Sequence, residues 1–210
     1  MTSALLTLAD SRLPAGGHAH SGGVEQAIAA GMVTDPGTLA TFLRRRLATS
    51  GAVAAGLAAA ACGADAAGLA ALDEEADART PSPALRAASR QQGRGLVRVG
   101  RRAWPSADWD ALPPQPHHPI ALGVAAAAAG LHPRNAASAA AYLSISGPAT
   151  AAQRLLAMDP LTVAALTARL SPDIDAVAQA AAGELPAATD LLLDLLAEVH
   201  AARKDRFFAS

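Results

Sequence analysis

Residues 120–130 read Ile-Ala-Leu-Gly-Val-Ala-Ala-Ala-Ala-Ala-Gly, a run without any charged side chain. A helix that is apolar all round is buried all round in a globular protein. We therefore expect this run to form the central core helix and Gly130 to end it. The rest of the chain is also rich in alanine, since 58 of the 210 residues are alanine and only 3% are aromatic. Alanine is the strongest helix former, whereas strands favour β-branched and aromatic residues, so the sequence predicts an all-α fold.

The chain is long enough to bury one sizeable core. We expect a single domain over residues 1–210, an alanine-rich bundle of roughly eight to ten helices. Several helix starts are marked by a small polar residue followed by proline, which suits the N-cap and first helical positions. These pairs are Asp35-Pro36, Ser82-Pro83, Asp159-Pro160 and Ser171-Pro172. Further helices are expected over residues 21–30, 50–61, 66–78 and 133–145, with a break at Gly147-Pro148.

Charged residues gather on three of these helices, although the formal net charge is only −1. We expect the run Arg44–Arg46 and the acidic residues of 73–77 to form solvated helix faces. Four arginines recur every fourth residue over 86–98 and form a stripe that we expect to face a protein partner or an acidic helix. The low net charge and the scarcity of aromatics argue against nucleic-acid and membrane binding.

The most unusual stretch is residues 10–31, which holds two Gly-Gly pairs and the histidines His18 and His20. Glycine accepts left-handed backbone angles and lets another chain approach closely. We expect Gly16 and Gly17 to be needed for one of these reasons, and Ser21 to cap the helix that follows. Neither a dinucleotide-binding nor a P-loop glycine pattern is present. Nucleotide binding is therefore not expected.

Several motifs together resemble the urease accessory protein UreF family in order and spacing. They are Leu13-Pro14-x-Gly16-Gly17, Ser21-x-Gly23-x-Glu25, Arg90-Gln91-Gln92-Gly93-Arg94, His118-Pro119-Ile120-Ala121-Leu122-Gly123 and the tail Arg206-Phe207-Phe208-Ala209-Ser210. The resemblance implies a cytoplasmic, non-enzymatic helical homodimer that binds UreD (also called UreH) and recruits the GTPase UreG to apo-urease. The resemblance further implies that this complex handles nickel, that the chain itself binds no cofactor tightly, and that the chain modulates the GTPase.

The resemblance also implies a partner-binding loop at 10–21 and a partner-binding tail at 203–210. The implied contact residues are Gly16, Gly17, His18, His20, Ser21, Gly23, Glu25, Arg206, Phe207, Phe208 and Ser210. We expect the tail to be flexible alone and ordered on UreD, with Arg206 paired to an acid and a phenylalanine in a pocket. The chain departs from the family where His18-Ala19-His20 replaces a Phe-x-Tyr-like pattern.

An alternative comes from the histidines, because neutral imidazole is a good ligand for zinc and nickel. A small helical metal-binding protein or metalloenzyme would use His18, His20, His117 and His118, if the fold brought the two pairs together. No Gly-x-Ser-x-Gly or His-Glu-x-x-His pattern supports an enzyme, and we expect no catalytic residue. The N-terminus lacks the basic residues of a secretory signal, so we expect a cytoplasmic protein.

Overall fold

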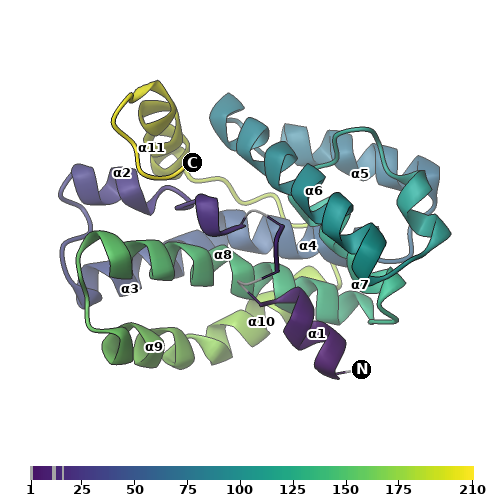
Figure 1. Ribbon diagram of the computed structural model, residues 1–210, viewed down its shortest axis with the longest axis horizontal. Coiled ribbons are helices and arrows are strands. Elements are labelled where there is room, and N and C mark those ends of the chain that lie inside the picture. Colours follow the sequence, from purple (N-terminus) through teal and green to yellow (C-terminus); the bar gives the residue numbers. More distant parts are fainter. Residues whose placement is uncertain (1, 11–12, 16) are drawn as a thin grey trace.

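The computed structural model describes residues 2–10, 13–15 and 17–210, and over these residues every regular element is a helix (Figure 1). The all-α prediction is therefore confirmed. The α-helices are α1 (Thr2–Leu8), α2 (Val24–Ala29), α3 (Pro36–Arg46), α4 (Ala52–Ala61), α5 (Ala66–Ala78), α6 (Pro83–Ala103), α7 (His118–Ala128), α8 (Pro133–Leu155), α9 (Pro160–Arg169), α10 (Ser171–Ala181) and α11 (Leu191–Ala202). Short turns are η1 (Gly17–Ala19), η2 (Leu47–Gly51) and η3 (Ala107–Ala111).

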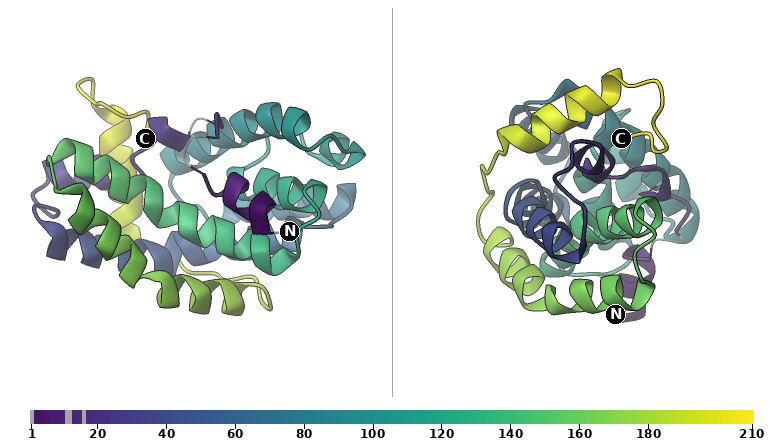
Figure 2. Two further views of the ribbon diagram at one scale, coloured as in Figure 1. Left: turned by 60° about the horizontal axis from the view of Figure 1, so that its bottom comes forward. Right: turned by 90° about the vertical axis from the view of Figure 1, so that its left-hand side faces the viewer.

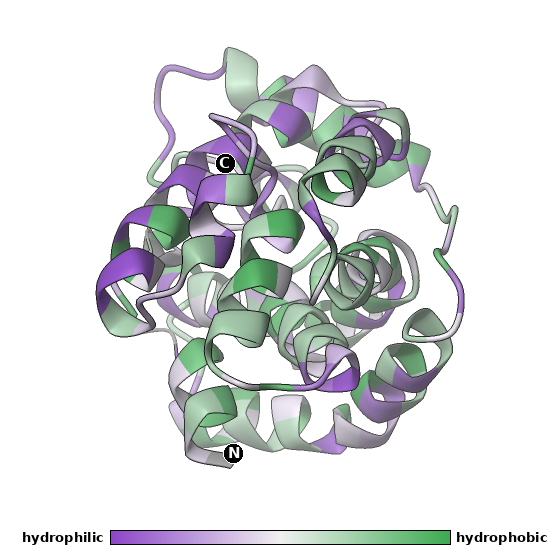
Figure 3. Ribbon diagram, turned by 90° about the vertical axis from the view of Figure 1, so that its right-hand side faces the viewer, coloured by the Kyte–Doolittle hydropathy of each residue, from purple (hydrophilic) through white to green (hydrophobic). Residues whose placement is uncertain are grey.

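Helix α7 lies at the centre, as its composition predicts, with every residue from Pro119 to Ala126 buried. It packs against α4, α6 and α8, and hydrophobic segments accordingly occupy the middle of the molecule in Figure 3. Small residues permit this close packing, since a Cβ on Gly123 would lie 2.5 Å from the carbonyl oxygen of Ala58 on α4. Within the described residues, no helix combines the length and apolar character that crossing a membrane requires.

Two predicted helix breaks are absent. Helix α3 runs through the π-helical turn η2 directly into α4, so Ser50 does not begin a new helix. Helix α8 continues through Pro148, which is buried. Proline removes one backbone hydrogen bond from a helix, but here α8 packs against α2, α3, α4 and α10 on its sides. Tertiary packing therefore outweighs the local preference for a break.

The N-caps predicted at the residues that precede proline are confirmed at three of the four positions. Asp35 forms a capping box with Thr38, and Ser82 and Asp159 accept backbone N–H groups at the starts of α6 and α9. Ser171 is instead the first residue of α10, where the residue before it is the N-cap and gives no side-chain hydrogen bond. The expected role of Ser21 is also wrong, because α2 begins only at Val24.

The arginine stripe of α6 meets the acidic helix α5. Arg90 donates to Asp73 at 2.8 Å and to Asp77 at 2.6 Å. Asp73 is only 6% exposed, so the expectation that the acidic residues form a solvated face is wrong at this position. The expectation for the arginine run fails in the same way at Arg46. Its two neighbours are exposed, whereas Arg46 is partly buried and lines two pockets.

Candidate partner-binding site

The C-terminal tail lies across the N-terminal loop, although nearly the whole chain separates them (Figure 2). The Ala209 N–H donates to the Ala19 carbonyl at 2.7 Å, and the Ser21 N–H donates to the Ser210 carbonyl. The side chains of Ser210 and His20 are also hydrogen-bonded, with Oγ 2.6 Å from Nδ1. We call residues 17–25 together with residues 203–210 the loop–tail module.

Glu25 holds the module together from inside, because its side chain is 96% buried and its carboxylate accepts three hydrogen bonds. The Phe207 N–H donates at 2.8 Å, the Phe208 N–H at 3.0 Å and the His200 Nε2 at 2.9 Å. Burial by itself raises the pKa of Glu25, but the hydrogen bonds from Phe207, His200 and Phe208 outweigh it, and the pKa lies below its usual value. The carboxylate is therefore held ionised.

The expectation that the tail is ordered only on a partner is wrong, because the chain's own loop already holds its backbone. The side chains divide between two environments. Phe208 is half-buried and packs against the core, whereas Phe207 is 84% exposed. Arg206 is also exposed and forms no ion pair with any described carboxylate. Phe207 is therefore the exposed aromatic side chain of the tail, and it follows the exposed charged residues Lys204, Asp205 and Arg206.

The predicted contact residues of the loop have mixed positions. His20, Ser21 and Glu25 are buried, so they support the tail and do not form an outer surface. Gly16 and the side chain of His18 lie outside the described residues. Gly17 is exposed, and a Cβ built on it meets nothing within 4 Å. The expected conformational or steric need for glycine is thus absent at Gly17.

The second glycine pair, Gly22 and Gly23, does require glycine. Gly22 and Gly23 have φ values of 59° and 88°, in the left-handed region that favours glycine. A Cβ on Gly22 would also lie 2.8 Å from the Pro148 Cγ and 3.2 Å from the Arg46 Cζ. The loop therefore depends on Gly22 to make its turn and to approach α8 closely.

One of the four histidines considered for a metal site, His117, is already occupied by other residues. Both ring nitrogens of His117 are occupied, with Nδ1 3.0 Å from the Ser89 Oγ and Nε2 2.8 Å from the Asp77 Oδ1. This Ser–His–Asp series joins α5, α6 and the start of α7, and Ser89 also accepts the N–H of His118. Its position among buried helix contacts indicates a structural cross-link. In the described part of the chain, no three His, Cys, Asp or Glu residues are grouped to hold a metal ion.

An exposed apolar row lies on α11, the helix that leads into the tail. Leu191, Leu195 and Val199 follow at intervals of four residues, which places them on one side of the helix. They are 73%, 54% and 51% exposed, while Leu193 and Leu196 on the other side are buried. This row forms an apolar surface that the described residues leave uncovered, and Phe207 in the tail is a further exposed apolar side chain.

Two residues, Gly22 in the module and His200 on the adjoining helix α11, carry no role in the sequence analysis. The signal for Gly22 is present, since it belongs to the second Gly-Gly pair. His200 has no comparable signal. It is a single histidine in an apolar helix, and its partner Glu25 lies 175 residues away. Only the folded chain brings these two buried groups together.

Comparison with known proteins decides the family. The UreF family model matches residues 33–171. The chain belongs to the UreF family. It is 55% identical over 208 residues to the urease accessory protein UreF of Mycolicibacterium vanbaalenii, which covers 98% of this chain and 97% of that protein. It is 50% identical over 206 residues to the urease accessory protein UreF of Mycobacterium tuberculosis, with the same coverage. The loop–tail module lies outside the residues that the UreF family model matches.

Proposed function

We propose that this UreF-family chain matures urease by binding UreD/UreH and recruiting the GTPase UreG to apo-urease, where GTP-dependent nickel insertion follows. In this proposal the chain acts in the cytoplasm as a homodimeric adaptor and modulates the GTPase. It performs no chemistry on nickel itself. Family membership supports the accessory role, and the loop–tail module suggests how the chain contacts UreD/UreH.

The observation that carries the proposal is the presentation of Phe207. A frayed terminus would lose conformational entropy on binding, which weakens affinity. Here the backbone from Phe207 to Ser210 is already held by Glu25, Ala19 and Ser21, while the Phe207 ring remains 84% exposed. Exposed aromatic side chains on rigid backbones are typical of the residues that dominate protein interfaces. The apolar row on α11, the helix that precedes the tail, offers a second exposed apolar surface.

The experiment is a pull-down of UreD/UreH with the Phe207→Ala variant. Burying a phenylalanine contributes about 1.5–3 kcal/mol, so the variant should bind about 10- to 100-fold more weakly. Its melting temperature should stay unchanged, because the lost ring is exposed. Recovery of UreG and urease activation should fall in parallel.

A matched control is Leu161→Ala, since Leu161 is 80% exposed and lies on α9, outside the module. This variant should bind UreD/UreH as the unmodified chain does. Normal binding by Phe207→Ala would contradict the proposed interface. The point variant is sharper than deletion of residues 206–210, because deletion also removes two hydrogen-bond donors from Glu25 and would disturb the fold.

A further inference from the structure

Two pockets of 190 and 360 Å³, both partly open to solvent, share one wall. The smaller lies between η2, α4, α6 and α8, and the larger extends beneath the loop to Phe208. Five residues line both cavities, namely Gly22, Arg46, Gln92, His118 and Leu143. The larger volume is within the range of about 300–1,000 Å³ that is common for small-molecule sites. The shared wall is therefore the place to look for a ligand.

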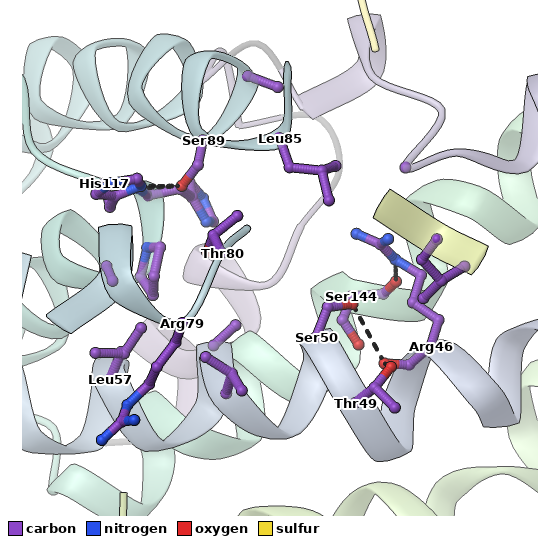
Figure 4. Close-up of a pocket in the computed structure, with 18 of the residues that line it drawn as sticks. Arg46, Thr49, Ser50, Leu57, Arg79, Thr80, Leu85, Ser89, His117 and Ser144 are labelled. Carbon is purple, nitrogen blue, oxygen red and sulfur yellow. Dashed lines mark hydrogen bonds between the residues drawn. The ribbon is translucent and has the colours of Figure 1, made fainter. Parts of the chain in front are cut away.

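Arg46 brings a positive charge to this wall without a counter-charge. Its Nε donates to the Ser144 carbonyl at 2.8 Å, as Figure 4 shows, and no other guanidinium N–H has a partner among the described residues. No described carboxylate forms an ion pair with it, unlike Arg45, which pairs with Asp190. Burial lowers the pKa of Arg46 to about 10, so the group remains charged at neutral pH. The remaining guanidinium N–H groups are not among the buried atoms that lack a partner, so they face the open part of the pocket, where an anion can reach them without displacing a protein group.

The neighbouring polar groups are neutral and also lack protein partners. Neither the Gln92 amide nor the His118 ring hydrogen-bonds to a described residue, although both line the two cavities. Burial and then the nearby His20 lower the pKa of His118 to about 4, so its ring is neutral at pH 7 and has one N–H to donate. The wall thus offers a guanidinium fork, an amide and an imidazole as hydrogen-bond donors.

Among the described residues, the side-chain carboxylates that line these pockets are Asp190 and Asp194 in the smaller one and Asp10 in the larger one, and the last residue, Ser210, also lines the smaller one. Asp190 is occupied by Arg45, and burial raises the pKa of Asp194, which weakens its negative charge. Arg154 adds a second cation to the larger cavity. The shared wall consequently favours a negative ligand over a divalent cation.

We propose that this wall is a binding site for a small oxyanion, held by the Arg46 guanidinium with Gln92 and His118. The guanidinium fork matches the paired oxygens of a carboxylate or phosphate group. Gly22 lies against Arg46, so the bound anion sits directly under the turn of the loop–tail module. The inference stands independently of the proposed UreD/UreH contact.

The test measures binding of inorganic phosphate and of acetate to the full chain by calorimetry and thermal unfolding. Sodium chloride keeps the ionic strength constant, because salts such as phosphate also stabilise proteins non-specifically. Arg46→Gln should weaken binding at least tenfold and abolish the ligand-dependent rise in melting temperature. The matched control is Arg44→Gln, which removes the same charge from an exposed residue of α3 and should bind normally.

Saturable binding of either probe that depends on Arg46 supports the site, and the stronger probe identifies whether the preferred anion is planar or tetrahedral. Equal binding by Arg46→Gln and Arg44→Gln, or no saturable binding of either probe to the unmodified chain, overturns it. If Arg46→Gln does not fold, Gln92→Leu decides the question. A several-fold loss in that variant supports the site, and unchanged binding overturns it.

Discussion

Replacing Glu25 by alanine tests how the loop–tail module is held together. The change removes the acceptor for Phe207, Phe208 and His200 at once. A buried donor left without a partner costs about 1–3 kcal/mol. The two tail amides can turn to water if the tail detaches, whereas His200 is 2% exposed and stays inside. We therefore expect the free energy of unfolding to fall by about 2–4 kcal/mol.

For a chain of this size, that loss corresponds to a melting temperature lower by about 5–15 °C. Amide hydrogen exchange should also accelerate at Phe207 and Phe208, which reports on tail detachment separately from global stability. The matched control is Glu74→Ala, an exposed acid on α5 with no partner among the described residues. The reasoning is refuted if Glu25→Ala melts within about 2 °C of that control, or if the tail amides remain protected.

The same variant has a defined pH dependence. The pKa of Glu25 is lower in the folded chain than in the unfolded chain. Its contribution is therefore fully present above the unfolded value of about 4.3 and is lost as the pH falls through the folded value. The difference in unfolding free energy between the unmodified chain and Glu25→Ala should shrink below about pH 4. A difference that grows on acidification would reverse the assigned sign.

Two further predictions concern packing. Gly22→Ala should lower the free energy of unfolding by about 2–4 kcal/mol, because it introduces backbone strain and a clash with the adjacent proline ring. The control Gly17→Ala should change the free energy of unfolding by less than about 0.5 kcal/mol. Equal urea midpoints for the two variants would contradict this prediction. Arg90→Met should cost about 2–4 kcal/mol because it leaves Asp73 buried without its cation, and the exposed Arg98→Met serves as control. A calorimetric melting temperature of Arg90→Met equal to that of the control would show that the buried pair adds nothing.

Local chemistry explains the parts of the fold that were predicted correctly. Helix formation follows from alanine content, and the cap at Asp35 follows from a side chain reaching an N–H two or three residues away. The break expected at Pro148 fails because a local preference of about 3 kcal/mol competes with packing on several sides of α8. Ser21 fails as a cap for a similar reason, since the following glycines adopt left-handed angles and delay α2.

The candidate site was predicted in part. The loop and the tail were identified as functional segments through the family resemblance, but their contact with each other was not. His117 was considered as a metal ligand, and only its contacts with Ser89 and Asp77 show that both ring nitrogens are taken. Sequence spacing contains no information on which distant side chain reaches an imidazole.

By itself, the sequence determined the helical class, the buried helix α7, most helix starts and the family. Each of these depends on composition, on periodicity within a helix, or on motifs that resemble the family's in order and spacing. Only the tertiary structure decided that Glu25 meets His200 and the tail, and that Arg46 turns inward while Arg45 pairs at the surface. Adjacent residues on a helix differ by about 100° in direction, so identical side chains in one run enter different environments. Which environment each one enters depends on helices far away in the chain, whose packing no local pattern records.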